Sequence, residues 1–169
     1  MPLKNISFSL KNLGIFLMGI SALVLAAVYV SQYGFGLNPC HLCLYQRIPY
    51  AVTIFLSALL IAFADRKTLA RILLVLLVLA FMASFGLALF HMGVENKWWT
   101  YASDCAGGDM FKPGASAEDI LAALKRAPVA RCDEKVDFLF GMSMAFYNVL
   151  TSAFLAVIAL YGLVKSSRR

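Results

Sequence analysis

Four long apolar stretches constrain the fold of this chain more than any other feature of its sequence. They cover about residues 13–33, 44–64, 72–92 and 138–164, and Arg47 is the only Asp, Glu, Lys or Arg within them. Each stretch has about 20 residues or more, which is enough for an α-helix to cross ~30 Å of lipid hydrocarbon. Short connections force neighbouring helices to run antiparallel. We therefore predict an all-α membrane protein, an antiparallel four-helix transmembrane bundle.

The composition excludes the main alternatives to a membrane protein. Hydrophobic residues make up 62 % and charged residues 14 % of the 169 residues, whereas soluble domains are nearer half apolar and a quarter charged. A single small globule has too little interior to bury that apolar surface, and a disordered chain would be far more polar. The first stretch is longer than a usual signal peptide and lacks a clear cleavage site, so we expect a retained span. The length predicts one integral-membrane domain over residues 1–169.

The distribution of basic residues predicts the orientation in the membrane. The segments expected on one side carry eight Lys and Arg residues against Asp65 alone: Lys4, Lys11, Arg66, Lys67, Arg71, Lys165, Arg168 and Arg169. On the other side, the loop 32–41 has no Lys or Arg, and the long segment 93–137 has six basic and eight acidic residues. The positive-inside rule places both termini in the cytoplasm and both cysteine-bearing loops outside it.

The long outer loop, about residues 93–137, has the composition of a soluble segment. Trp98 and Trp99 near its start are typical of an interfacial aromatic belt. Ser116 is a candidate N-cap, and the amphipathic pattern that follows to Arg126 predicts a short helix lying on the membrane surface.

Cys40 and Cys43 form a C-x-x-C motif where the first outer loop enters the second span. Asn38 is a candidate cap for that helix and Pro39 suits its first position. Both thiols would then lie near unpaired backbone N–H groups and the positive end of the helix dipole, which favour the thiolate. Arg47, one turn deeper, adds a permanent positive charge. An interfacial Arg that reaches lipid headgroups is the alternative interpretation.

A second pair of cysteines, Cys105 and Cys132, lies 27 residues apart in the long loop with polar or charged neighbours, so we expect neither to be a buried structural thiol. The four cysteines allow three interpretations. Two structural disulfides are disfavoured because a C-x-x-C bridge closes a very small loop and is more typical of redox chemistry. A zinc site using the four thiolates or His41 is disfavoured because the second pair is not tightly spaced. A thiol–disulfide relay between a mobile pair and a fixed pair suits the arrangement best.

The motif at residues 39–47 resembles the C-x-L-C-x-x-Q-R signature of the DsbB family, disulfide bond formation protein B of bacterial inner membranes. The similarity covers nearly the whole chain, because residues 90–95 with Trp98 and Trp99 resemble the end of that family's third span. Residues 132–138 resemble its entry into the last helix.

The resemblance implies a protein-dithiol:quinone oxidoreductase of the bacterial inner membrane. Such an enzyme reoxidises DsbA, a thioredoxin-fold dithiol oxidase of the periplasm, and passes two electrons to a membrane quinone. The expected cofactor is ubiquinone or menaquinone, and no metal or nucleic acid is expected.

The resemblance also implies roles for individual residues. Cys105 matches the cysteine that the partner thiol attacks, and Cys132 matches its disulfide mate. Cys40 matches the thiol that exchanges with this pair, and Cys43 matches the thiolate that donates electrons to the quinone. We expect Cys40–Cys43 and Cys105–Cys132 as resting disulfides, with a Cys40–Cys132 bridge during turnover.

Two further residues are candidates for the quinone site. Arg47 matches the residue beside the quinone ring, and His91 at the end of the third span suits proton delivery to a reduced quinone. Gln46 receives no catalytic role, because some members of the family have an acidic residue at its position.

Two alternative functions stay open at this stage. A quinone-linked oxidoreductase of the vitamin K epoxide reductase-like type also has two cysteine pairs and four helices. A non-catalytic membrane metal-binding or scaffold protein is the alternative from another functional class.

Overall fold

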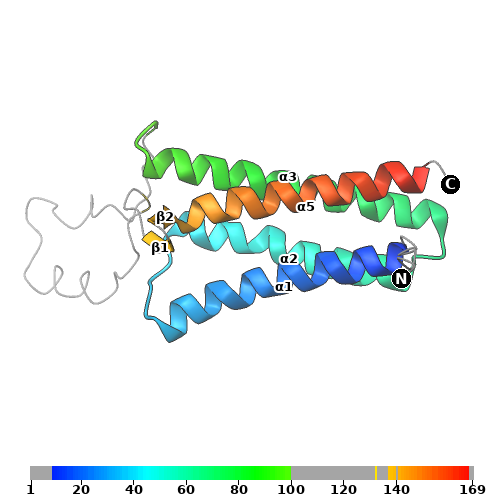
Figure 1. Ribbon diagram of the computed structural model, residues 1–169, viewed down its shortest axis with the longest axis horizontal. Coiled ribbons are helices and arrows are strands. Elements are labelled where there is room, and N and C mark those ends of the chain that lie inside the picture. Colours follow the sequence, from blue (N-terminus) through cyan, green and yellow to red (C-terminus); the bar gives the residue numbers. More distant parts are fainter. Residues whose placement is uncertain (1–8, 100–131, 133–136, 140, 168–169) are drawn as a thin grey trace, which may run out of the picture.

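The computed structural model describes residues 9–99, 132, 137–139 and 141–167. Four helices long and apolar enough to cross a membrane dominate these residues: α1 (Leu10–Gly34), α2 (His41–Ala62), α3 (Lys67–Glu95) and α5 (Met144–Ser167). They lie side by side along one axis, and α1 and α3 run opposite to α2 and α5 (Figure 1). The predicted four-helix membrane bundle is confirmed. The surface helix predicted between Ser116 and Arg126 lies outside the described residues.

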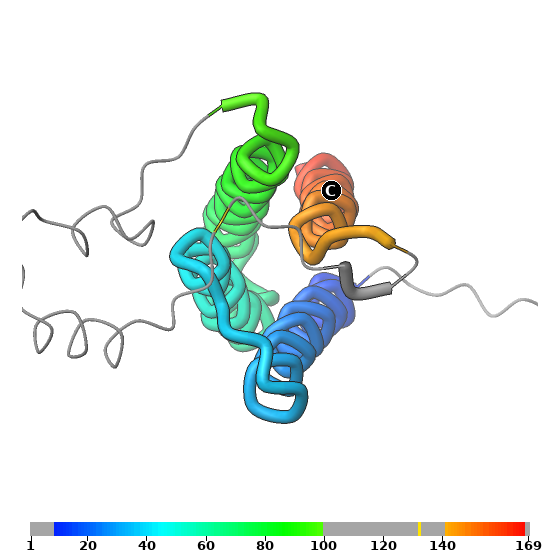
Figure 2. Tube along the Cα trace, turned by 90° about the vertical axis from the view of Figure 1, so that its left-hand side faces the viewer, coloured from blue at the N-terminus to red at the C-terminus, as the bar shows by residue number. Residues whose placement is uncertain are grey.

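The helices are arranged in chain order around the bundle (Figure 2). The most extensive packing is between α3 and α5, followed by α1 with α2 and α2 with α3, whereas α1 and α5 make few contacts. Because lipid tails are as apolar as leucine, such helices associate through close packing rather than through a hydrophobic driving force. The weak contact between α1 and α5 leaves the most open seam of the bundle.

Apolar side chains fill the interior of the bundle, and large apolar side chains also cover its outside. Leu17, Leu74, Leu77, Phe81 and Leu155 are fully buried in the central core. On the outward faces, side chains such as Leu23, Phe55, Leu79 and Phe154 are more than half exposed. These exposed apolar side chains are suited to contact with lipid, whereas the surface of a soluble protein would carry more polar side chains.

Close backbone approach is clearest where α1 crosses α2. A Cβ atom on Gly14 would lie 2.7 Å from Ile61 Cγ1 and 3.3 Å from the Ser57 carbonyl oxygen. A larger residue at position 14 would therefore require the Ile61 side chain to move or the two helices to separate. Nearby, the Thr53 hydroxyl donates to Ser21 Oγ across the same pair at 3.1 Å, a type of bond worth roughly 0.6 kcal/mol within membranes.

The ends of the helices differ from the apolar stretches. α3 begins at Lys67 rather than near residue 72, because Lys67 and Arg71 in its first two turns can reach the polar membrane surface with their charged ends. The last helix begins at Met144 rather than near 138. Two short antiparallel strands stand there instead, β1 (Asp137–Leu139) and β2 (Met142–Ser143). Gly141 has a φ of 71°, which a right-handed helix cannot include, and Ser143 Oγ accepts a hydrogen bond from the Phe146 amide to cap α5.

Both helix ends nearest the termini lie at the end of the bundle opposite the C-x-x-C motif (Figure 1). At that end the Lys11 ammonium lies 3.2 Å from Asp65 Oδ2, and Arg71 Nη2 donates to the Ser166 carbonyl at 3.1 Å. The Lys11–Asp65 pair is exposed and contributes little energy. Among the described residues, the basic side chains used for the orientation prediction belong to the ends of α1, α3 and α5 that meet here: Lys11, Arg66, Lys67, Arg71 and Lys165.

This arrangement gives a prediction for the topology. In a variant lacking native cysteines, a thiol introduced as Phe35→Cys should react with a membrane-impermeant maleimide added outside the cytoplasm, because Phe35 is exposed between α1 and α2. A thiol introduced as Asp65→Cys should react only after the membrane is permeabilised. If Asp65→Cys were labelled from outside and Phe35→Cys only after permeabilisation, the topology would be opposite to the prediction.

Candidate redox site

The N-terminus of α2 is built around the sulfur of Cys40. Cys40 itself is the N-cap residue, and its Sγ accepts a hydrogen bond from the Cys43 amide at 3.3 Å. The prediction that Asn38 caps this helix with Pro39 at its first position is wrong, because the helix begins two residues later, at His41. The reactive sulfur therefore takes the place that a Ser or Asp oxygen occupies at other helix starts.

The two sulfurs of the motif lie together at this helix end. Cys40 Sγ is 2.9 Å from Cys43 Sγ, and Cys40 is buried while Cys43 is partly exposed. The hydrogen bond to Cys43 and burial raise the pKa of the Cys40 thiol to about 12. In the reduced state Cys40 therefore holds its proton at neutral pH and directs it toward Cys43. The expectation that the helix end favours the thiolate at both cysteines is wrong for Cys40, because its hydrogen bond to Cys43 and its burial favour the thiol.

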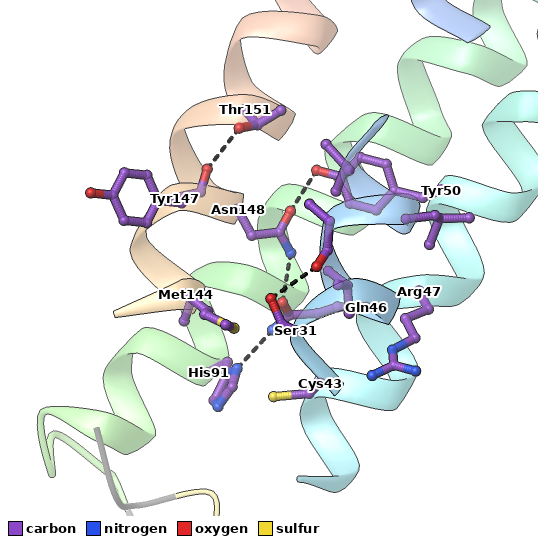
Figure 3. A pocket seen from close by; sticks show the side chains of 15 residues that line it. Ser31, Cys43, Gln46, Arg47, Tyr50, His91, Met144, Tyr147, Asn148 and Thr151 are labelled. Carbon is purple, nitrogen blue, oxygen red and sulfur yellow. Dashed lines mark hydrogen bonds between the residues drawn. The ribbon is translucent and has the colours of Figure 1, made fainter. Parts of the chain in front are cut away.

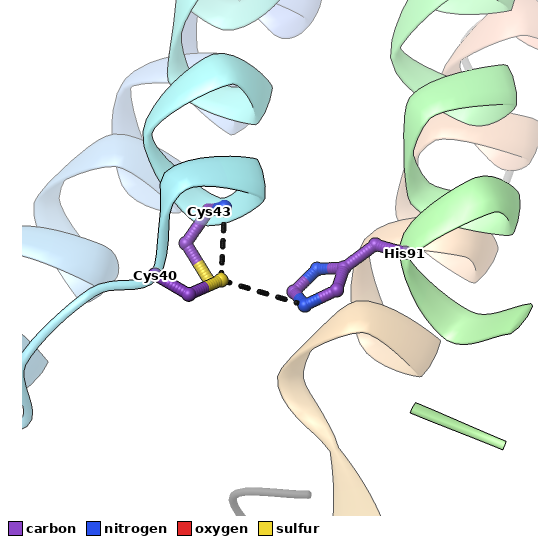
Figure 4. A group of neighbouring side chains, drawn as sticks. All are labelled: Cys40, Cys43 and His91. Atoms are coloured by element: carbon purple, nitrogen blue, oxygen red, sulfur yellow. Dashed lines mark hydrogen bonds between the residues drawn. The ribbon is translucent and has the colours of Figure 1, made fainter. Parts of the chain in front are cut away.

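His91 reaches this pair from the last turns of α3 (Figure 4). Its Nε2 lies 3.5 Å from Cys40 Sγ, and the ring is buried. Glu95, one turn further along α3, is also buried, with Oε1 3.7 Å from the same Nε2. Its other oxygen, Oε2, has no hydrogen-bond partner among the described residues.

Cys132 packs directly against the C-x-x-C motif. It forms a small buried cluster with Cys40, Leu42 and Val94, and Cys43 packs at its edge. The expectation that Cys132 is not buried is wrong, because this apolar cluster covers it to 5 % exposure. Burial raises the pKa of the Cys132 thiol to about 11. Cys105 lies outside the described residues, so its pairing stays a prediction.

A cavity of about 420 Å³ opens beside Cys43 within the bundle (Figure 3). Side chains from all four long helices line it, most of them apolar; they are Val24, Leu25, Ala27, Val28, Ser31, Cys43, Gln46, Arg47, Tyr50, His91, Met144, Ala145, Tyr147, Asn148 and Thr151. The structure thus brings Cys43 and Arg47 of α2 and His91 of α3 to one cavity.

Arg47 is held at the edge of this cavity by α1. Its Nη1 donates to Gln32 Oε1 at 2.7 Å, and its guanidinium lies 5.0 Å from the centre of the Tyr29 ring. Its Nε is buried and has no hydrogen-bond partner among the described residues. A permanent cation with a free donor beside an apolar cavity is suited to an acceptor oxygen on a bound ligand.

Sequence reasoning missed the polar residues that connect this cavity to the cysteines. Gln46 Nε2 lies 2.9 Å from His91 Nδ1, and Asn148 Nδ2 donates to Gln46 Oε1 at 2.6 Å. A polar residue within a transmembrane stretch is a functional candidate by default. Asn148 lies within the fourth apolar stretch, so the sequence alone could have marked it as a candidate. Only the fold shows that it contacts Gln46.

Cys40, Cys43 and His91 could also bind a metal ion when both cysteines are reduced. The ligand atoms of Cys40, Cys43 and His91 all lie within 4.8 Å of one another. Thiolates and imidazole suit soft metals and zinc. His41, considered as a ligand from the sequence, is exposed at the start of α2 instead.

Comparison with known proteins identifies the family. Residues 11–162 match the family of disulfide bond formation protein DsbB. The chain belongs to the DsbB family. A protein of Rickettsia prowazekii (strain Madrid E) described as uncharacterized is 30 % identical over 149 residues, covering 87 % of this chain and 84 % of that protein. No solved structure matched the chain.

Membership in the DsbB family assigns the general activity of this multi-pass membrane protein. It is a thiol oxidoreductase of disulfide bond formation. The C-x-x-C motif at the start of α2 is suited to this chemistry, because disulfide exchange proceeds through a thiolate and both sulfurs lie at the positive end of the helix dipole.

The burial of Cys132 gives a prediction that can be checked on the reduced protein. A pKa of about 11 leaves about one molecule in a thousand as thiolate at pH 8. Alkylation of Cys132 by iodoacetamide should therefore be slow at pH 8 and should accelerate about tenfold per pH unit until pH 11. Mass spectrometry of peptides provides the measurement.

Denatured protein is the control for this alkylation, since an unfolded cysteine has a pKa of about 8.5. Equal rates for native and denatured Cys132 at pH 8 would show that the cysteine is not buried against Cys40.

Proposed function

We propose that this protein reoxidises a DsbA-like dithiol partner outside the cytoplasm and passes two electrons to a membrane quinone. The observation that carries the proposal is the position of Cys43, which belongs to a redox motif and also lines an apolar cavity within the bundle. An electron donor at the wall of a lipid-level cavity is what oxidation by a lipid-soluble acceptor requires.

The cavity fits the head of a quinone. Its mostly apolar lining suits the ring, and the free Nε donor of Arg47 suits one of the ring oxygens. The seam between α1 and α5, where contacts are few, offers access from the bilayer. Arg47, His91 and Cys43 are therefore the residues proposed to face the bound ring, which supplies the capacity to accept two electrons and two protons.

Disulfide exchange within the protein would proceed through Cys132. The partner dithiol reduces the Cys105–Cys132 disulfide, so that the partner becomes oxidised and two thiols form here. The Cys132 thiolate then attacks Cys40, which breaks the Cys40–Cys43 bond and leaves the electron pair on Cys43. The packing of Cys132 against Cys40 supports this step, because direct exchange requires the two sulfurs to meet.

Arg47 would stabilise the negative charge that develops on the thiolate or on the reduced acceptor during electron transfer. A fixed positive charge in a site of low dielectric stabilises a thiolate or a reduced acceptor more than it would in water. The hydrogen bond to Gln32 and the contact with Tyr29 hold the guanidinium in place before the reaction. This preorganisation is the contribution that we assign to Arg47.

The decisive experiment mixes the purified protein anaerobically with reduced DsbA-like partner and quinone. We expect the quinone absorbance to fall as the partner becomes oxidised, with one quinone reduced for each partner disulfide formed. Replacement of Cys43 by Ser should abolish the change. A stable zinc complex with four free thiols and no quinone reduction would instead favour the metal-binding alternative.

Membership in the DsbB family favours this function over a vitamin K epoxide reductase-like one. The choice between ubiquinone and menaquinone follows from the same assay, run with each quinone in turn. The preferred quinone is the one with the higher kcat/KM.

We predict that Arg47→Ala and Arg47→His impair quinone reduction selectively. Loss of a charge-assisted contact should raise the KM for quinone or lower turnover by about tenfold to a hundredfold. A mixed disulfide between the partner and Cys105 should still form, because Arg47 lies within α2, below the cysteine pair. Gel analysis of that complex and quinone kinetics provide the two measurements.

Arg66→Ala is the matched control, since Arg66 lies at the opposite end of the bundle, before α3. Normal quinone kinetics together with loss of the mixed disulfide in the Arg47 variants would assign Arg47 to docking or folding instead.

A further inference from the structure

A chain of hydrogen bonds runs through the bundle interior to the redox pair (Figure 3). The Tyr50 hydroxyl donates to Asn148 Oδ1 at 2.5 Å, and Asn148 Nδ2 donates to Gln46 Oε1 at 2.6 Å. Gln46 Nε2 then meets His91 Nδ1 at 2.9 Å. Residues from three helices, α2, α5 and α3, thus form one continuous path.

The chain has a direction, which follows from the chemistry of its members. An amide side chain donates through its nitrogen and accepts through its oxygen. With the Tyr50 hydroxyl donating at one end, Asn148 turns its nitrogen toward Gln46, and Gln46 turns its nitrogen toward the imidazole. A neutral imidazole that accepts at Nδ1 carries its proton on Nε2.

The groups that face the other ring nitrogen, Nε2, independently indicate the same tautomer. Nε2 faces the Cys40 sulfur at 3.5 Å and a carboxylate oxygen of Glu95 at 3.7 Å. The proton of Cys40 is itself directed at Cys43, so Cys40 presents a lone pair to the ring. Both groups facing Nε2 are acceptors, and a proton on Nε2 satisfies them.

We propose that Tyr50 and Asn148 are positioning residues that act through Gln46 to hold His91 in the Nε2–H tautomer. In this tautomer His91 donates a hydrogen bond to the Cys40 sulfur (Figure 4). The cost of burying two amides and a hydroxyl at lipid depth is offset because each is hydrogen-bonded.

The assigned tautomer has a consequence for disulfide exchange, and this part rests on the proposed function. When the Cys105 thiolate attacks Cys132 in a Cys40–Cys132 disulfide, a Cys105–Cys132 bond forms and the electron pair of the broken bond passes to Cys40. The proton stays on His91 Nε2, which stabilises the departing thiolate as a donor. No net oxidation or reduction occurs in this step.

The tautomer can be measured directly by NMR of full-length protein in nanodiscs, with ¹⁵N-labelled histidine. The chain has two histidines, so His41→Gln assigns the signals. Ring nitrogen shifts distinguish a protonated from an unprotonated nitrogen. The variants are Tyr50→Phe, which removes only the terminal donor, and Asn148→Leu, which interrupts the chain. Tyr33→Phe makes the same chemical change on an exposed tyrosine of α1 and is the control.

We expect His91 to be protonated on Nε2 in the unmodified protein and in Tyr33→Phe. Tyr50→Phe and Asn148→Leu should both shift population toward Nδ1–H. In rapid-quench mass spectrometry, they should slow resolution of the Cys40–Cys132 disulfide about tenfold, equivalent to about 1.4 kcal/mol.

A proton on Nδ1 in the unmodified protein would overturn the proposal, and so would an unchanged tautomer in both chain variants. The NMR result stands apart from the enzymatic function. If the protein reduced no quinone at all, the proposed function would fail while the tautomer still decided the role of Tyr50 and Asn148.

Discussion

The hydrogen bond from the Cys43 amide to the Cys40 sulfur joins the fold of this protein to its chemistry. A helix that starts at a membrane surface has unpaired amide groups, and here the reactive sulfur satisfies one of them. The same contact places both sulfurs at the positive end of the helix dipole, where negative charge is favoured. The position of α2 in the bundle therefore decides where the redox pair lies relative to the other helices.

The other helices supply what the C-x-x-C motif lacks. The end of α3 brings His91 and Glu95 to the sulfurs, and α1 holds Arg47 through Gln32 and Tyr29. α5 contributes Asn148 and one wall of the cavity. The site therefore depends on the packing of all four helices, although both sulfurs of its C-x-x-C motif lie at the start of one.

The polar side chains within the bundle form hydrogen bonds that the low dielectric of the membrane interior strengthens. In a medium of low dielectric, an unpaired amide is costly and a paired one is strongly oriented. Tyr50, Asn148 and Gln46 form such a paired series inside a mostly apolar bundle. Arg47 Nε and Glu95 Oε2, by contrast, are buried without partners in the described part of the chain, at the edges of the reactive pair.

The sequence alone determined the four spans, their antiparallel order and the redox character of the C-x-x-C motif. Apolar stretches long enough to cross lipid permit few other structures, since every backbone group at that depth must be bonded internally. The tertiary structure decided which residues of different helices meet: Cys132 with Cys40, His91 with Gln46, and Gln46 with Asn148. It also decided the start of α5, where Gly141 and the Ser143 cap interrupt an apolar stretch that continues in the sequence. Such contacts depend on the rotation and depth of each helix, which are set by side-chain packing between helices rather than by the pattern within any one of them.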